Sequence, residues 1–314
     1  MLKGFDNVFR TGLNNEIQDS LVEYFDFGLL EKGNYFNVTL GETDYYGNDY
    51  SKLTLSDNPN FSKGEAWEGF RKNWVWQSGV THTPSPLVST NDQIPGVSGV
   101  YVDGTFYPSD TTGAYAHKID HFNGRVVFDT PIDKDSLVQA EFSYKYMNII
   151  YANSLPWLRE VRTSTLDVSK RDSVSVPTEM EIQLPAIAIE IVPEGKIKPF
   201  HIGPFGKYVY TDILWHCIAE DAVTRNNMVD IISMQHDSFF TTINAEAVAS
   251  GSAFPINALG YTNPSAKDYR QLVNDYPGDT MSITNIRVQG VDMFSSNLYA
   301  GVVRATIETI TDSF

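Results

Sequence analysis

The sequence predicts a β-rich α+β protein in which a sheet flanked by two helices carries an inserted antiparallel β module. Aromatic residues (17 Tyr, 18 Phe and 5 Trp) stand mostly in short runs with Val, Thr and Ile, which favours strands. Two segments have the apolar spacing of an amphipathic helix. A block between them turns at Asp-Gly and Asn-Gly pairs, as antiparallel hairpins do.

Length and composition restrict the classes of protein to consider. A chain of 314 residues suggests two modules, or one module with a large insertion. With 42% hydrophobic and 20% charged residues, long disordered stretches are not expected. The net charge of −16 disfavours a protein that reads nucleic acid, because an acidic surface repels phosphate.

Targeting signals and cysteine usage indicate folding in a reducing cytoplasm. The N-terminus lacks the apolar core of a signal peptide, and no apolar run approaches the roughly 20 residues of a membrane helix. Cys217 is the single cysteine, so an intrachain disulfide framework is impossible. We therefore expect no membrane association.

The first element predicted is a helix over about 11–29. Its apolar residues recur at the spacing of one helical face, and Gly28 and Gly33 bracket its end. The residues on that face are Leu13, Ile17, Leu21, Tyr24 and Phe25.

The block 35–155 is expected to form a self-contained β module. Tyr35 to Leu40 alternates as a strand does, whereas Gly64 to Trp76 fits either a short helix or a packed β edge. Asp103-Gly104 and Asn123-Gly124 each stand between two alternating runs, which predicts two hairpins. Leu137 to Met147 then reads as one long strand, so the expected arrangement is a meander of about four strands. Pro84, Pro86 and Pro95 mark an irregular connector.

After a Ser- and Thr-rich connector at 163–176, the chain returns to a predicted core domain formed by 1–34 and 156–314. Leu184 to Val192 is apolar on both faces, which is typical of a central strand, and Lys207 to Ile218 alternates as a second long strand. Asp221 opens a predicted helix with apolar positions at Met228, Ile231, Ile232 and Phe239. Residues 244–280 are predicted to be a loop, and the strands Met281–Val291 and Leu298–Ile310 close the chain.

The motifs that could indicate a phosphate loop, a nucleophile or a metal site have the wrong spacing or lie on the wrong type of element. Gly203 to Lys207 has two residues between its glycines where a phosphate loop needs four, and Gly96-Val97-Ser98-Gly99 is out of register for a nucleophile elbow. His117 and His121 flank Asp120, but on a strand residues four apart lie about 13 Å apart, too far to share a metal. The other histidines considered, none with a partner at ligand spacing, are His201, His216 and His236.

We therefore predict no catalytic, cofactor-binding or metal-binding residues, and a protein that is not an enzyme. Among 39 acidic residues an accidental pair with glycosidase spacing cannot be distinguished from a real one. The abundant aromatic residues also allow a carbohydrate-binding face, although packing between sheets and subunits explains them more simply.

Three segments taken together resemble the tail-terminator and neck proteins of tailed bacteriophages. They are Leu184 to Ile191, Lys207 to Ala222 and Asn226 to Ile232. That family has an N-terminal helix, a Pro-apolar strand, a long strand that runs into a helix, and a final hairpin. The same order occurs in this chain over about 1–34 and 180–314, whereas 35–155 lies outside the resemblance.

The resemblance implies a structural subunit of the virion, assembled in the host cytoplasm. It implies a homo-oligomeric ring, commonly sixfold, that joins the tail to the head connector. Expected partners are other neck, tail-tube or sheath proteins, and genomic DNA would pass through the lumen without sticking to acidic side chains. Because ring contacts can pair strand edges, we expect the terminal hairpin or the strand 207–218 to lie near a neighbouring subunit.

Two alternatives stay open. The chain could be another virion component, such as a collar, baseplate or decoration protein. It could also be a β-rich protein that binds glycans or a receptor.

Overall fold

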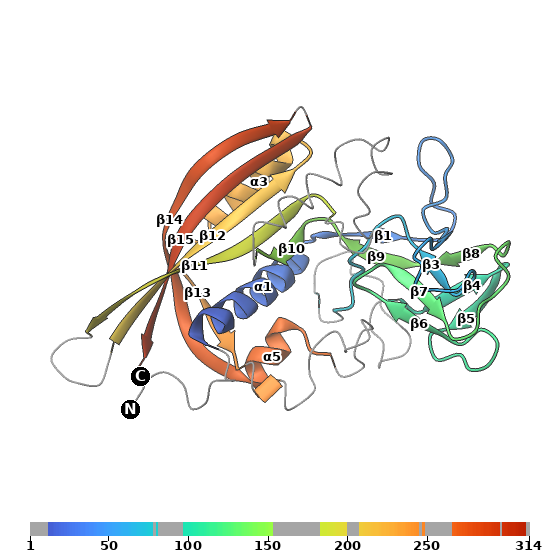
Figure 1. Cartoon of the computed structure of the whole chain (residues 1–314), viewed down its shortest axis with the longest axis horizontal. Coiled ribbons are helices and arrows are strands. Elements are labelled where there is room, and N and C mark those ends of the chain that lie inside the picture. The colour runs from blue at the N-terminus through green and yellow to red at the C-terminus, as the bar shows by residue number, and fades with distance from the viewer. Residues whose placement is uncertain are drawn as a thin grey trace.

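The protein is a β-rich α+β structure, described by a computed structural model over residues 12–77, 80, 97–152, 183–199, 207–244, 247–248, 266–295 and 297–311. A strongly curved six-stranded sheet lies at one end of the molecule and three smaller sheets lie toward the other (Figure 1). The strand order in the large sheet is β10-β11-β12-β15-β14-β13. Its strands are β10 (Asn148–Tyr151), β11 (Ala186–Pro199), β12 (Lys207–Ala219), β13 (Ser238–Ile243), β14 (Pro277–Ser295) and β15 (Leu298–Thr311).

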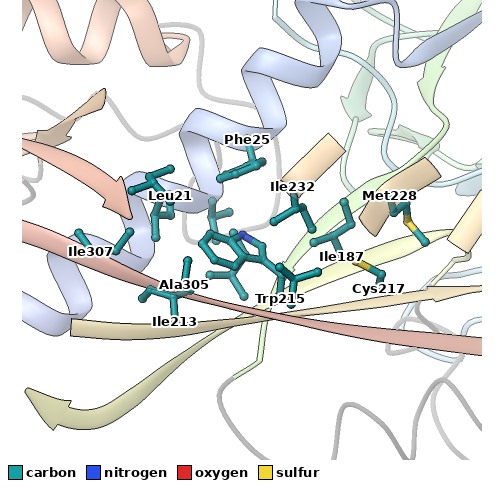
Figure 2. Close-up of a cluster of buried hydrophobic side chains, with 14 of the residues drawn as sticks. Leu21, Phe25, Ile187, Ile213, Trp215, Cys217, Met228, Ile232, Ala305 and Ile307 are labelled. Atoms are coloured by element: carbon teal, nitrogen blue, oxygen red, sulfur yellow. The ribbon is translucent and has the colours of Figure 1, made fainter. Parts of the chain in front are cut away.

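Two helices, α1 (Leu13–Glu31) and α3 (Ala222–Ser233), pack on the same face of this sheet, which we call the helix-covered face. The third helix is α5 (Tyr269–Asp275), beside β13 and β14. Apolar residues alternate along β12 and β15, so every second side chain enters the core beneath the helices. Trp215 is fully buried at the centre of that core, 5.7 Å from Phe25 between ring centroids (Figure 2).

The prediction of the N-terminal helix is confirmed, with both ends two residues later than expected. Asp221 caps α3 as predicted: its side chain accepts a hydrogen bond from the Thr224 amide at 2.8 Å. The terminal hairpin is also confirmed as β14 and β15, although β14 is longer than predicted at both ends. Cys217 lies buried in the core, where desolvation raises the pKa of its thiol to about 12.

The block 35–147 forms three antiparallel sheets around a second core, in which Trp74 and Phe142 stack at 4.2 Å. The orders are β1-β9, β2-β3-β7-β6 and β5-β4-β8. These strands are β1 (Tyr35–Val38), β2 (Thr54–Leu55), β3 (Ala66–Glu68), β4 (Gly99–Val102), β5 (Thr105–Pro108), β6 (His117–Asp120), β7 (Arg125–Phe128), β8 (Val138–Ala140) and β9 (Phe142–Lys145).

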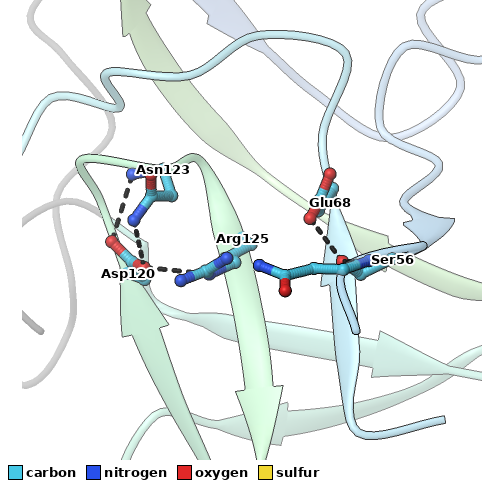
Figure 3. A network of polar contacts seen from close by, with 6 residues as sticks. Ser56, Glu68, Asp120, Asn123 and Arg125 are labelled. Atoms are coloured by element: carbon cyan, nitrogen blue, oxygen red, sulfur yellow. Dashed lines mark hydrogen bonds and ion pairs between the residues drawn. The ribbon is translucent and has the colours of Figure 1, made fainter. Parts of the chain in front are cut away.

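Both predicted hairpins are confirmed. β4 and β5 meet at Asp103 and Gly104, which have positive φ of 51° and 81°, as a tight hairpin turn requires. β6 and β7 meet at Asn123-Gly124, where the Asp120 carboxylate accepts from the Asn123 amide and from Arg125 Nε at 2.9 Å (Figure 3). Asp120 and Arg125 are both buried, so this ion pair fixes the turn from inside the module. A second contact drawn there joins Ser56 to Glu68 across β2 and β3.

Predictions about three segments were wrong, and the open alternative at 64–76 is resolved in favour of a strand. Leu137 to Met147 is not one strand, since β8 and β9 join different sheets, and β8 pairs with β4 so that the module is no sequential meander. The ambiguous stretch 64–76 holds the short strand β3 and no helix. Phe239 lies in β13, a strand we did not predict, and is 69% exposed. The expected loop at 244–280 contains α5 and the start of β14.

The boundary of the core domain also differs from the predicted one. β10 lies inside the range 35–155 assigned to the module, yet it pairs in parallel with Ala186–Ile189 of β11 in the large sheet. Two parallel strands are joined by a long connection, so the residues around β10 do not indicate that it pairs with β11. The predicted connectors at Pro84–Pro95 and at 163–176 lie outside the described residues.

Candidate functional site at the open edge of the sheet

The β13 edge of the large sheet is closed by side chains. The Tyr269 hydroxyl donates to the Thr241 carbonyl at 2.8 Å and accepts from the Thr241 amide at 3.1 Å. Two residues on, the Ile243 amide donates to the Ser20 hydroxyl at 2.9 Å. At Thr241 and Ile243, α5 and α1 therefore take the place of a further strand and satisfy outward backbone groups of β13.

The β11 edge is protected in another way. β10 covers Ala186–Ile189, and Gln18 Nε2 then donates to the Ile189 carbonyl at 2.7 Å. Beyond that point, Pro193 and Pro199 lack a backbone N–H and β11 changes register between Val192 and Lys196. Proline, lysine and bulges are the usual means by which an edge strand avoids pairing with another chain.

The β14 edge is different. β13 pairs only with residues 277–283 of β14, and within the described chain no strand pairs with 284–295 on that side. We call this segment the open edge, and Figure 1 places it at the rim of the sheet. Val288, Val291 and Met293 are 49%, 53% and 55% exposed along it. An edge that combines unpaired backbone groups with exposed apolar side chains is suited to pairing with another chain.

The open edge has two chemically distinct sides. Val288 pairs with Val303 of the buried core, and Val291 pairs with Gly301, where an added Cβ would meet Val229 of α3 at 2.7 Å. Both valines thus lie on the helix-covered face. Arg287 and Asp292 pair with Arg304 and Ala300 on the opposite face.

A β-bulge creates this segregation. Register shifts occur between Thr284 and Arg287, between Val288 and Gly290, and between Met293 and Ser295. Residues 287 and 292 are five apart, so in a regular strand they would lie on opposite faces. The extra residue between Val288 and Gly290 brings both charges to one face.

Arg225 of α3 holds the hairpin that presents the open edge. Its Nη1 donates to the carbonyls of Ala300 at 2.9 Å and Asp292 at 3.3 Å, and the residue is buried. A charged donor on buried carbonyls is worth more than a neutral one, so the hairpin is fixed before any partner binds.

The opposite face of the sheet carries cross-strand polar pairs. His216 Nε2 and Glu190 Oε2 lie 2.7 Å apart, and Asp212 accepts from Arg304 and from Thr306. Burial alone would raise the pKa of Asp212, but these hydrogen bonds outweigh it and the pKa is lowered. His216 thus lies in the sheet, in a row of cross-strand polar contacts.

A cluster of three carboxylates, Asp19, Glu23 and Asp26, lies on α1. Burial, followed by repulsion from Asp26, raises the pKa of Glu23 to about 7, although Lys145 opposes the shift. Lys145 Nζ lies 2.6 Å from Asp26 Oδ2 and so links β9 to α1. This cluster was not predicted, although spacings of four and three residues place the carboxylates on one face of the helix.

Among the described residues, those considered earlier as possible sites form no metal-binding group. His117 and His121 are buried in the module, and His117 Nδ1 lies 2.9 Å from the Tyr115 carbonyl oxygen. Desolvation lowers the pKa of His117, which favours its neutral form. His236 lies 2.9 Å from Asp237 at the surface, while His201, Gly96 and Gly203–Gly206 lie outside the described residues.

The described residues hold no group of three His, Cys, Asp or Glu arranged to bind a metal ion. They also include no helix with the length and apolarity to cross a membrane.

Comparison with models of known protein families and with curated proteins gave no match to this chain.

Proposed function

We propose that this protein is a non-catalytic structural subunit of a tailed-bacteriophage virion, which forms a ring at the neck or tail terminus. In this role it joins the tail to the head connector, lets DNA pass and works in the virion after assembly in the host cytoplasm. The partners would be further copies of itself and other neck, tail-tube or sheath proteins.

The observation that carries the proposal of a structural, assembling subunit is the open edge at 284–295, whereas the ring and its place in the particle come from the resemblance. The fold closes β13 with Tyr269 and Ser20 and blunts β11 with prolines, yet leaves this third edge unpaired and apolar. A soluble protein that keeps such an edge has a use for it in assembly. From the sequence we expected either the terminal hairpin or the strand 207–218 to contact a neighbouring subunit. β12 is paired along its length with β15 and along most of it with β11, which leaves the hairpin.

The order of elements also supports the proposal. α1, the β11–β12 pair, α3 and the β14–β15 hairpin form one layered unit, in the order that the resemblance to terminator and neck proteins implies. The sheets of residues 35–147 would then project from that unit, where they can contact a collar or sheath protein.

The experiment that tests this function is localisation in purified phage particles. A chain with a C-terminal affinity tag, detected by gold labelling in electron micrographs, should appear at the junction of head and tail. Label on fibres, on the baseplate or on the capsid surface would contradict the neck assignment, and absence from particles would contradict a virion role.

A second candidate function, glycan binding, is favoured by one surface feature. Five rings form a continuous row, the aromatic band, with neighbouring centroids 5.0–5.7 Å apart. Its members are Tyr50, Phe70, Tyr144, Phe36 and Tyr146. Phe36 and Phe70 are about half exposed, and the Arg71 guanidinium lies over Tyr144.

Exposed ring faces can stack on the apolar faces of sugars, while the tyrosine hydroxyls and Arg71 can bond sugar hydroxyls. Binding to immobilised host surface polysaccharide that is lost in F36A would support this second function. No binding by the wild-type chain would exclude it for that polysaccharide.

A further inference from the structure

We infer that the free protein is a twofold dimer in which the open edge of one copy pairs antiparallel with the open edge of a second copy. This deepens the proposed assembly role, since it names the occupant of the edge. It does not require the phage particle, because it follows from the sequence and geometry of residues 284–295 alone.

The open edge is self-complementary in one antiparallel register. With the twofold axis between Gln289 and Gly290, Arg287 of each copy stands opposite Asp292 of the other. The same register places Val288 opposite Val291 and Ile286 opposite Met293. Directly opposite pairs of unlike charge, or of two apolar side chains, are those that stabilise antiparallel strands.

The faces of the strand agree with this register. A twofold axis perpendicular to the sheet keeps the helix-covered faces of both copies on one side. Arg287 and Asp292 both lie on the opposite face, so each charge meets its partner there. Val288 and Val291 both lie on the helix-covered face and meet on that side. Without the bulge before Gly290, the charged residues of the pair would point to different sides.

Pairing also explains the exposure of the edge. The contact would cover Val288, Val291 and Met293, which are about half exposed in the single chain, and would use the backbone groups that β13 leaves unpaired. Because Arg225 already holds the hairpin in place, the hairpin would lose little conformational entropy on binding. A twofold contact closes on itself, so the proposed ring would need a separate head-to-tail contact.

The test is charge reversal, read by sedimentation velocity on the full chain. The wild-type chain should be a dimer, and R287D or D292R alone should weaken it at least about tenfold, because each places two like-charged pairs in the interface. An equimolar mixture of R287D and D292R should form a heterodimer, since both charge pairs are then complementary. The double variant R287D/D292R should regain the wild-type dimer.

K134D is the matched control, because it reverses an exposed charge in the module and should leave the dimer unchanged. Thermal melts monitored by circular dichroism verify that each variant folds. A monomeric wild-type chain at its highest soluble concentration would overturn the inference. A dimer or larger oligomer insensitive to R287D, or single variants that do not recover on mixing, would overturn it too. None of these results bears on localisation in the particle, so the two proposals fail separately.

Discussion

Tyr269 and Thr241 close one edge of the large sheet, because the tyrosine hydroxyl bonds both the amide and the carbonyl of Thr241. Burial raises the pKa of Tyr269 to about 12, so the hydroxyl keeps its proton and donates at any ordinary pH. The Tyr269 side chain therefore makes the two hydrogen bonds with Thr241 that a neighbouring strand would otherwise make. The open edge differs, because in the described chain no strand pairs with 284–295 on that side.

Removing that hydroxyl should expose the β13 edge. Y269F keeps the ring in its apolar site but leaves two backbone groups of Thr241 without their partner. We expect a loss of about 1–3 kcal/mol in the free energy of unfolding, measured with urea. Hydrogen exchange at Thr241 should accelerate, whereas exchange at Trp215 in the sheet centre should not. Unchanged exchange at Thr241 would show that the hydroxyl does not protect the edge.

Arg225 should control the rigidity of the terminal hairpin. R225M keeps most of the apolar volume but removes the donor to the buried carbonyl of Ala300 and to the partly buried carbonyl of Asp292. The expected loss of stability is about 2 kcal/mol, with faster amide exchange at 297–301. R270M, which alters a half-exposed arginine beside Glu31, is the control and should change stability far less. Equal effects of the two substitutions would contradict the special role of Arg225.

Glu23 should make stability depend on pH near neutrality. Its folded-state pKa of about 7 lies above the ordinary 4.5, because of burial first and of Asp26 second. The folded state therefore holds this proton more tightly, and stability falls as pH rises from about 4.5 through 7. The loss is at most about 3.5 kcal/mol, since each pKa unit corresponds to about 1.4 kcal/mol.

E23Q should remove most of this dependence and stabilise the protein at pH 8. E220Q, at an exposed carboxylate before α3, serves as the control and should leave the pH profile unchanged. Chemical unfolding at several pH values gives the comparison. A wild-type profile that is flat between pH 5 and 8 would be inconsistent with a raised pKa.

The N-terminal cap of α3 gives a smaller, local prediction. In D221A the Thr224 amide loses the carboxylate that accepts its hydrogen bond at 2.8 Å. We expect the free energy of unfolding to fall by about 1 kcal/mol, and D221N to recover most of it. No difference between D221A and D221N would mean that the cap contributes little.

Local signals in the sequence located the elements whose structure is set locally. Gly104 and Gly124 occupy turns that need positive φ, and Asp221 caps a helix, so each could be predicted from its own neighbourhood. α5 was missed because 244–280 was judged a loop from its Ala, Gly, Asn and Pro content, although Asp268 and Gln271 form a capping box and Tyr269, Leu272 and Val273 stand at helical spacing. β10 and β13 were missed, and β8 and β9 were predicted as one strand, because pairing with strands distant in the sequence defines them.

The candidate site was predictable only in outline. Edge strands were expected to matter, and the terminal hairpin was one of two candidates. Whether 284–295 is covered depends on where pairing with β13 ends, at Ile283 of β14, and the side chains that cover β13 itself come from Tyr269 and Ser20. Those contacts join segments that lie far apart in the chain. The complementarity of Arg287 and Asp292 is visible in the sequence, but only the bulge shows that both charges share a face.

The most direct test of the assembly role is hydrogen–deuterium exchange of the amides in 284–295, measured on the wild-type chain over a wide range of concentration. If the open edge is an assembly surface, these amides should exchange quickly in dilute solution and become protected as concentration rises, while those of β13 stay protected throughout. R287D should remove the concentration dependence. Fast exchange over 284–295 at every concentration, with larger assemblies present, would contradict the assignment of this edge as the assembly surface.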